Sequence, residues 1–301
     1  MKAVLLHAYG GVEQLHYEDT SMPQLKGGDV LVKVDATSVN PIDWKIRRGD
    51  RKDTMTLPMP AILGRDVSGT IVSLGPGAQG FEPGDRVMGL VEHAYAEFLV
   101  TRPENLTRTP DDLETEDAAA LPLVVTTGAQ LIENGVQPKA GQTVLVTGAL
   151  GSVGRTAVYV AKKHGMTVIA GVRAAQRHEA ESLGADRVIA LDHDQAIASL
   201  GEVDAIADTV GHDVIKKLIP YIRHSGVLAS VLGKPTGVDT KDIKVRPVVT
   251  KSDAQRLHQL AEAVGAGEFS IPIVRRMKLS QVREAQLAAE RGAGGKILLV
   301  P

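Results

Sequence analysis

The chain has 301 residues, more than one hydrophobic core usually holds, so we expect two domains. Lys and Arg number 34 against 36 Asp and Glu, and a net charge of -2 makes nucleic acid and acidic membranes poor partners. The absence of Cys excludes disulfides, thiolate nucleophiles and thiolate zinc sites, and it fits a cytoplasmic protein. No apolar run approaches the ~20 residues of a membrane-spanning helix.

The first part of the chain contains short apolar runs bounded by Gly and Pro, a pattern that predicts a largely antiparallel β domain. We expect strands at 30–34, 69–73 and 85–88. The apolar run at 296–300 predicts a last strand that has no parallel partner and returns to this domain. The domain should therefore comprise residues 1–118 and 251–301.

From residue 119 to residue 250, helical runs alternate with β-branched runs, which predicts a doubly wound parallel sheet with crossover helices. The fold class is therefore α/β, with a second, mostly β domain. The expected strands are 143–147, 167–172, 188–191, 203–208, 227–231 and 243–248. The expected helices are 152–164, 175–183, 194–200 and 212–222, and one more follows the sheet at 253–266.

A glycine turn lies between the first of these strands and the first helix. Gly148, Gly151 and Gly154 flank Ser152 and Val153 in a GxxGxxG spacing. Glycines allow a sharp turn and a close approach of a pyrophosphate to backbone N–H groups, and the helix N-terminus adds partial positive charge. A glycine triplet can also be a simple turn, but the order of strand, turn and helix favours a dinucleotide site.

The end of the second strand indicates which dinucleotide is bound. An NAD site carries an acid there, which bonds the ribose 2'-hydroxyl. This chain has Arg173 there instead, no Asp or Glu at 172–175, and Arg177 one helical turn later. Two guanidiniums can hold a 2'-phosphate, which predicts NADPH. The alternative is that both are solvated surface arginines.

Several motifs in register resemble the medium-chain dehydrogenase/reductase superfamily, within it the zinc-independent quinone oxidoreductases related to zeta-crystallin. The resemblance spans nearly the whole chain and implies a GroES-like catalytic domain and a Rossmann domain. Its motifs are Met1 to Val4 with Gly10-Gly11, Val39 to Asp43, Leu63 to Gly69, Pro83 to Val87, Leu121-Pro122 with Thr127, Gly148 to Gly154, and Gly295 to Ile297.

The resemblance also implies that no zinc is bound. Zinc-dependent relatives carry a Cys near the place of Asp43 and a His-Glu pair after the glycine that Gly64 resembles, where this chain has Arg65 and Asp66. A guanidinium stays protonated and offers no lone pair to a metal. Without a Lewis acid, the suitable substrates are those that accept hydride readily, such as quinones and activated enones.

The resemblance places Asn40 to Lys45 beside the nicotinamide, at the edge between a strand and a loop. Asn40 is the first candidate for contact with a carboxamide or a substrate oxygen, although Asn before Pro also starts turns. Asp43 could pass a proton, or could instead pair with Arg47 or Arg65. Lys45 replaces a Tyr of some relatives and is expected at the cofactor.

Further site residues follow from the resemblance, for Thr127 and Arg291, and from position in the sheet, for the others. Thr127 matches a Thr near the nicotinamide, with helix capping as the alternative. Thr209, Val231, Leu232 and Gly233 end strands on the carboxyl edge of the sheet, where ligands of such sheets bind. Arg291 matches a cofactor-contacting Arg, and it could equally serve a helix C-terminus.

The sequence therefore predicts an NADPH-dependent, zinc-free reductase that transfers hydride to a quinone. An enoyl or 2-alkenal double-bond reductase is the alternative enzyme, and a non-catalytic NADPH-binding sensor or RNA-binding protein is the alternative of another class. The strand at 243–248 should lie at a sheet edge, where two copies can pair, so we expect a homodimer.

Overall fold

The structure is a computed structural model that describes residues 1–301, apart from the side chain of His212. The chain forms two units, and each is described by itself. Met1–Leu123 and Ser252–Pro301 make one of them, and Val124–Lys251, which is inserted between these two segments, makes the other.

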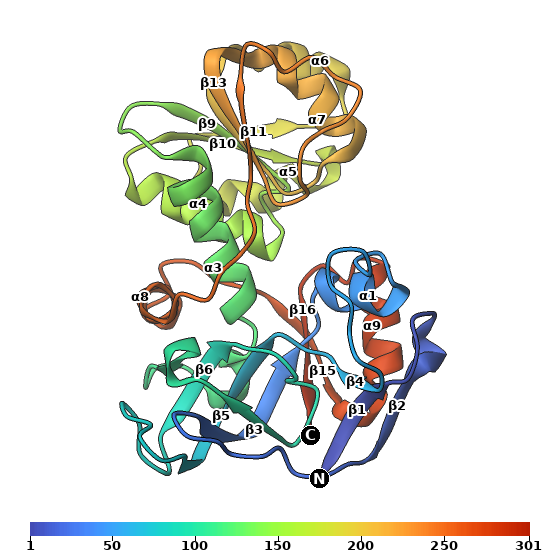
Figure 1. Cartoon of the computed structure of the whole chain (residues 1–301). Helices are drawn as coiled ribbons and strands as arrows, with labels where there is room; N and C mark the ends of the chain where they lie inside the picture. Colours follow the sequence, from blue (N-terminus) through green and yellow to red (C-terminus); the bar gives the residue numbers. More distant parts are fainter. The chain divides into compact units, whose positions relative to one another are not determined.

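The inserted unit contains the doubly wound sheet (Figure 1), and its six strands pair in the order β11-β10-β9-β12-β13-β14, all parallel. The sixth strand is an edge strand, as expected from the sequence. The strands are β9 (Thr143–Thr147), β10 (Thr167–Val172), β11 (Arg187–Ala190), β12 (Val203–Asp208), β13 (Ile222–Ser230) and β14 (Lys244–Pro247).

The helices of this unit cover both faces of the sheet, as the alternation of apolar residues requires. On one face Leu145 and Ile206 pack against Ile197 of α6 and Ile215 of α7 in a single buried cluster. Helix α4 packs on β9 and β10. The bounds are α3 (Pro122–Gln130), continued by a π-helical turn (Leu131–Val136), α4 (Ser152–Lys163), α5 (Arg177–Ala180), α6 (Asp194–Ala198) and α7 (His212–Leu218).

The helix expected at 175–183 is broken into three short pieces. A 3-10 turn, Ala174–Gln176, precedes α5, and a second 3-10 turn, Glu181–Leu183, follows it. Gly184 ends the segment with φ of 72°, a left-handed conformation that glycine adopts without strain.

The other unit is built on a larger sheet in the order β15-β16-β3-β5-β6-β8, with β7 paired to β3 and a separate small sheet β2-β1-β4. The predicted mostly β, largely antiparallel character is present. The strands are β1 (Lys2–Leu6), β2 (Leu15–Asp19), β3 (Val30–Ser38), β4 (Ala61–Ile62), β5 (Asp66–Leu74), β6 (Arg86–Leu90), β7 (Phe98–Thr101), β8 (Leu106–Arg108), β15 (Ile273–Lys278) and β16 (Lys296–Val300).

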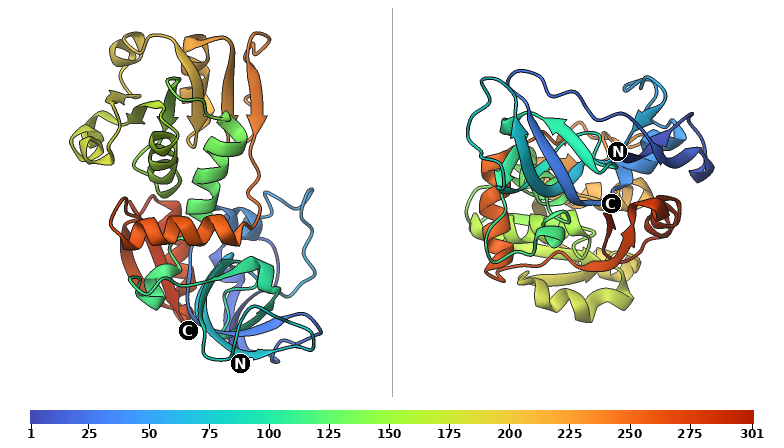
Figure 2. Two further views of the ribbon diagram at one scale, coloured as in Figure 1. Left: turned by 90° about the vertical axis from the view of Figure 1, so that its left-hand side faces the viewer. Right: turned by 90° about the horizontal axis from the view of Figure 1, so that it is seen from below.

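The C-terminal strand corrects one expectation. β16 pairs antiparallel with β3, as a returning strand should, but it also pairs in parallel with β15, so the prediction that it has no parallel partner was wrong. The sequence IVRRMK of β15 carries its charges at exposed edge positions, which hid the strand. Helix α9 (Val282–Glu290) connects the two strands. Both chain ends lie in this unit (Figure 2).

Three other helices belong to the same unit: α1 (Pro41–Arg48), α2 (Thr115–Ala118) and α8 (Ala254–Gly265). Helix α8 begins where predicted, with the Asp253 carboxylate accepting the Arg256 N–H at 2.9 Å. Asn40 to Lys45 were expected at the edge between a strand and a loop, and helix α1 was not predicted from the sequence. Pro41 at its first turn and Gly49 at its end, with φ of 85°, are the signals that mark it.

Candidate active site

In the glycine turn after β9, two of the three glycines leave no room for a Cβ. Gly148 has φ of +61°, and a Cβ there would lie 2.6 Å from the Thr209 hydroxyl. A Cβ on Gly154 would lie 2.2 Å from the Gly148 carbonyl oxygen. Gly151 is the N-cap of α4, so the helix presents its first N–H groups at this turn. A cradle of backbone donors that a Cβ would fill suits the pyrophosphate of a dinucleotide.

Asp208, at the end of β12, organises the same carboxyl edge. Its buried carboxylate accepts hydrogen bonds from the Thr147 hydroxyl at 2.9 Å, the Ser230 hydroxyl at 2.8 Å and the Gly211 N–H at 2.9 Å. The Thr209 hydroxyl donates to the Thr147 carbonyl at 2.7 Å. Asp208 therefore ties β9, β12 and β13 together. Sequence reasoning missed this role, although an acid ending a buried strand was its signal.

The other predicted residues at this edge follow β13. The Leu232 N–H donates to the Ser230 hydroxyl at 3.1 Å, and the Leu232 side chain is 41% exposed. Val231 is half-buried, and Gly233 has φ of +94°. The structure thus brings Thr209, Val231 and Leu232 to strand ends that Asp208 and Ser230 join.

Arg173 and Arg177 lie exposed just after β10, as predicted. Arg173 Nε donates to the Gln176 side-chain oxygen at 3.2 Å. Residues 172–175 hold no carboxylate, but one from another strand lies here: Asp192, after β11, accepts the Ala174 N–H at 2.8 Å. The neighbouring strand supplies it, so it was invisible in residues 172–175.

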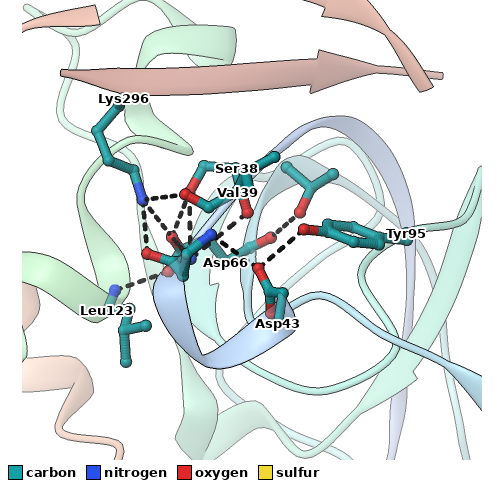
Figure 3. Close-up of polar contacts among 9 residues, drawn as sticks. Ser38, Val39, Asp43, Asp66, Tyr95, Leu123 and Lys296 are labelled. Carbon is teal, nitrogen blue, oxygen red and sulfur yellow. Dashed lines mark hydrogen bonds and ion pairs between the residues drawn. The ribbon is translucent and has the colours of Figure 1, made fainter. Parts of the chain in front are cut away.

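A network of buried polar side chains occupies the other unit (Figure 3). The Asp66 carboxylate accepts from Lys296 Nζ at 3.2 Å, from Asn40 Nδ2 at 2.8 Å and from the Ser38 hydroxyl. Its second oxygen accepts the N–H of Leu123 at 2.7 Å. Lys296 Nζ also donates to the Asn40 side-chain oxygen at 2.7 Å. Asp66 and Lys296 thus form a buried, fully hydrogen-bonded ion pair.

Asp43 lies beside this network. Its Oδ2 accepts the Asn40 N–H at 2.8 Å and the Tyr95 hydroxyl at 2.8 Å, whereas no described residue donates to its Oδ1. Burial raises the pKa of Asp43 to about 7. Burial and the neighbouring Asp43 raise the pKa of Tyr95.

The structure shows which contacts these residues make. Asp43 pairs with neither candidate arginine, because Arg47 pairs with Glu290 and Arg65 faces Glu92. Asn40 precedes a helix rather than a simple turn, and its side chain is fully buried. The sequence did not single out Tyr95 and Lys296 as members of the site; a Lys inside the apolar run of β16 was the available signal.

The remaining candidates are Lys45, Thr127 and Arg291. Lys45 is half-buried on α1, and burial together with the charges of Arg51 and Arg48 lowers its pKa. Thr127 lies inside α3, where its hydroxyl bonds the Thr250 hydroxyl at 2.7 Å, so it does not cap that helix. Arg291 is exposed and ends α9.

The described residues contain no group of three or more His, Asp or Glu that could hold a metal ion. Among the described helices none combines the length and the apolar character needed to cross a bilayer.

A glycine turn joining a parallel strand to a helix, in a doubly wound sheet inserted into a mostly β unit, defines a nucleotide-binding dehydrogenase. Residues 26–111 match the family described as Alcohol dehydrogenase GroES-like domain, and residues 152–256 match the family described as Zinc-binding dehydrogenase.

Three known proteins illustrate the similarity. The mitochondrial NAD(P)H oxidoreductase RTN4IP1 of Mus musculus is 30% identical, over 99% of this chain and 89% of that protein. The structure of the quinone oxidoreductase from Coxiella burnetii is 29% identical, with a TM-score of 0.88 over 100% of this chain and 99% of that one. A mycobacterial protein solved in complex with NADPH is 26% identical, with a TM-score of 0.86 over 100% of both chains. The chain belongs to the medium-chain dehydrogenase/reductase superfamily, in its quinone oxidoreductase branch, and is an oxidoreductase.

Proposed function

We propose that the chain is a zinc-independent reductase that uses NADPH to reduce a quinone. The observation that carries this proposal is the glycine turn at Gly148 to Gly154, in which Gly148 and Gly154 leave no room for a Cβ, with Arg173 and Arg177 at the next strand end. The similar quinone oxidoreductase and the similar protein in complex with NADPH support the substrate and the cofactor.

In this proposal the chain's own residues mainly bind and orient. The N–H groups at Ser152 and Val153 hold the pyrophosphate, because they lie at the start of α4, whereas the Gly151 N–H already donates to the Gly148 carbonyl at 2.9 Å. Arg173 and Arg177 hold the 2'-phosphate through charge-assisted hydrogen bonds. When bound, the reduced nicotinamide supplies the hydride. Asn40 and Asp43 act as positioning residues, since both side chains are buried. The catalytic role of Thr127 and the contact of Lys45 and Arg291 with the cofactor stay predictions.

Zinc-independence follows from residue chemistry. Arg65 stands where zinc-dependent relatives place a ligand, and a guanidinium cannot bind zinc. We expect full activity after exhaustive treatment with a chelator. Loss of activity on chelation, followed by recovery with stoichiometric zinc, would show that a metal takes part.

The proposal is tested with a panel of quinones and 2-alkenals, each assayed with NADPH and with NADH. Oxidation of NADPH by an ortho-quinone, faster than by any alkenal, is the expected result. Preference for alkenals would make the protein a double-bond reductase. Tight NADPH binding without turnover of any quinone or enone would favour a cofactor-binding sensor instead. Residence in the cytoplasm is part of the same proposal, and fractionation of the source cells tests it.

A further inference from the structure

A cavity of about 460 Å³ opens in the unit that contains β5 and β6. Leu90 and Val91, at the end of β6, give it an apolar wall. Its charged lining residues come from four different segments: Asp29, Arg65, Glu92 with His93, and Arg102. An apolar wall with a few convergent polar groups is the usual composition of a small-molecule site.

Arg65 is the cation of this cavity with unused donors. Its Nε is buried, and no described residue accepts from it. The nearest carboxylate, on Glu92, lies 3.8 Å from the guanidinium and is 61% exposed. Arg102 differs, because its Nε lies 3.3 Å from Asp29. A guanidinium carries five N–H donors, and leaving a buried one unpaired is unfavourable, so Arg65 is the group that would gain most from an anionic oxygen.

His93 lines the same cavity as Arg65, on a short turn whose two ends are hydrogen-bonded to Gly64 and Arg65. The Val91 N–H donates to the Arg65 carbonyl at 2.8 Å, and the Ala94 N–H donates to the Gly64 carbonyl at 3.2 Å. His93 has φ of 64°, a strained conformation for a residue with a side chain. Its Nδ1 lies 2.9 Å from the Ile62 carbonyl oxygen, which can only accept, so Nδ1 carries a proton and Nε2 is the ring nitrogen left for a ligand.

We propose that Arg65 and His93 form the subsite that takes the oxygen of the substrate carbonyl, a quinone oxygen, and this rests on the proposed function. The quinone accepts a hydride, which consists of two electrons and one proton, from the reduced cofactor. Negative charge then develops on the quinone oxygen. Arg65 donates hydrogen bonds to that oxygen. The Nε2–H bond of the His93 imidazolium breaks as the O–H bond forms. Hydroquinone and oxidised cofactor leave, and water returns a proton to the imidazole.

The first experiment compares Arg65→Met with Arg102→Met, a matched control that removes the paired cation of the same cavity. With saturating NADPH and 9,10-phenanthrenequinone, kcat/KM should fall ~10- to 100-fold in Arg65→Met and less than ~3-fold in the control. Arg65→Lys, which keeps the charge, should recover part of the loss. Equal effects of Arg65→Met and Arg102→Met would overturn the proposal.

The second experiment needs no turnover. The cofactor-free protein is titrated with 4-nitrophenol, whose phenolate has a distinct absorbance and resembles the anionic product oxygen. Wild type and Arg102→Met should bind the phenolate, and Arg65→Met should bind it ~10-fold more weakly or worse. If wild type, Arg102→Met and Arg65→Met bind the phenolate equally, Arg65 is not part of the subsite, whether or not the protein reduces a quinone. If wild type reduces no quinone while Arg65 still governs phenolate binding, the proposed function fails and the oxygen-binding role stands.

The proton donor is tested through the pH dependence of kcat/KM. The charged groups that face His93 across the cavity are Asp29, Arg65, Glu92 and Arg102. In wild type, kcat/KM should fall with rising pH, because the proposed step requires a proton on Nε2. His93→Asn and His93→Gly both accept the left-handed backbone, so they should fold, show lower kcat/KM and lack this fall. An unchanged profile in both variants contradicts the role of His93.

Discussion

Two carboxylates in one unit have different surroundings. Asp66 lies within 3.2 Å of the Lys296 ammonium, whereas Asp43 accepts only the Asn40 N–H and the Tyr95 hydroxyl. The buried acid without a cation at hydrogen-bond distance has its pKa raised by burial to about 7. Asp43 therefore holds a proton over a pH range in which an exposed acid has lost it.

This proton makes stability depend on pH. In the unfolded chain Asp43 ionises near pH 3.8, and in the folded chain near pH 7, so between these values the folded state binds more protons. The free energy of unfolding should therefore decrease as pH rises through this window, by an amount on the order of 4 kcal/mol at most. Urea unfolding from pH 5 to pH 8 should show a smaller decrease in Asp43→Asn than in wild type. Parallel curves would mean that Asp43 is ionised throughout.

Cofactor preference is the second prediction at this scale. Replacing Arg173 and Arg177 by Ala should reduce the ratio of kcat/KM for NADPH to that for NADH by ~100-fold, because two charge-assisted contacts are lost. Asp192→Asn should raise the ratio, since it removes a carboxylate from the same strand end. Lys241→Ala, at a surface pair with Asp239, serves as control. A wild type that prefers NADH would contradict NADPH as cofactor.

How well single residues were predicted depended on whether their partners are close in sequence. The glycine turn and Arg173 follow local rules of strand, turn and charge. Asp66 and Lys296 are 230 positions apart, and only the tertiary fold brings them together. The same holds for Tyr95 and Asp43, which are 52 positions apart. Sequence patterns cannot show such pairs.

At the scale of elements, the effect of replacing a glycine between β9 and α4 depends on which glycine is replaced. In Gly154→Ala the new methyl meets a backbone oxygen at 2.2 Å, so strand and helix must separate. Gly151 has φ of -69°, and its Cβ would lie 3.2 Å from the same oxygen.

We expect Gly154→Ala to lower the free energy of unfolding by ~2 kcal/mol and Gly151→Ala to change it by less than ~1 kcal/mol. Urea unfolding of the two variants checks the difference. NADPH affinity, measured by calorimetry, should fall in Gly154→Ala because α4 no longer presents its N–H groups at the turn. Equal stability of the two variants would show that the loop relaxes freely.

Elements were predicted where their apolar periodicity is strong. The parallel strands are buried on both faces and therefore appear as continuous apolar runs, as in Val144 to Val146 of β9. Helix α1 was not predicted because its sequence PIDWKIRR is short and half charged, although it begins with Pro and ends before Gly. β15 was not predicted for a similar reason. An edge strand can leave part of its surface exposed, so its sequence carries charges and shows no apolar run.

At the scale of the whole molecule, β14 pairs only with β13 and leaves one edge open. Val249, just beyond it, is 82% exposed, which suits a second copy of the chain covering this edge. Pro247 lacks an N–H and limits the length of such pairing.

We expect light scattering at micromolar concentration to give twice the chain mass of 31.9 kDa. Val249→Asp should shift the mass towards a monomer, because it places a charge in the interface without disturbing the packed core. Val274→Asp, at a 43% exposed position of β15, should leave the mass unchanged. A monomeric wild type would refute the dimer.

Because one unit is inserted into the other, the two units complete their folding at different times during translation. Val124–Lys251 is continuous, so it can fold as soon as it leaves the ribosome. The surrounding unit must wait, because β3 lacks its neighbour β16, and Asp66 its ammonium partner, until Lys296 has been translated. During that delay Val4, Leu6 and Leu15, which pack in one cluster with Ile297 and Leu299, stay uncovered on the nascent chain. Chaperones that protect this protein during translation should therefore bind its earliest segment, and they should be released only after the last strand emerges.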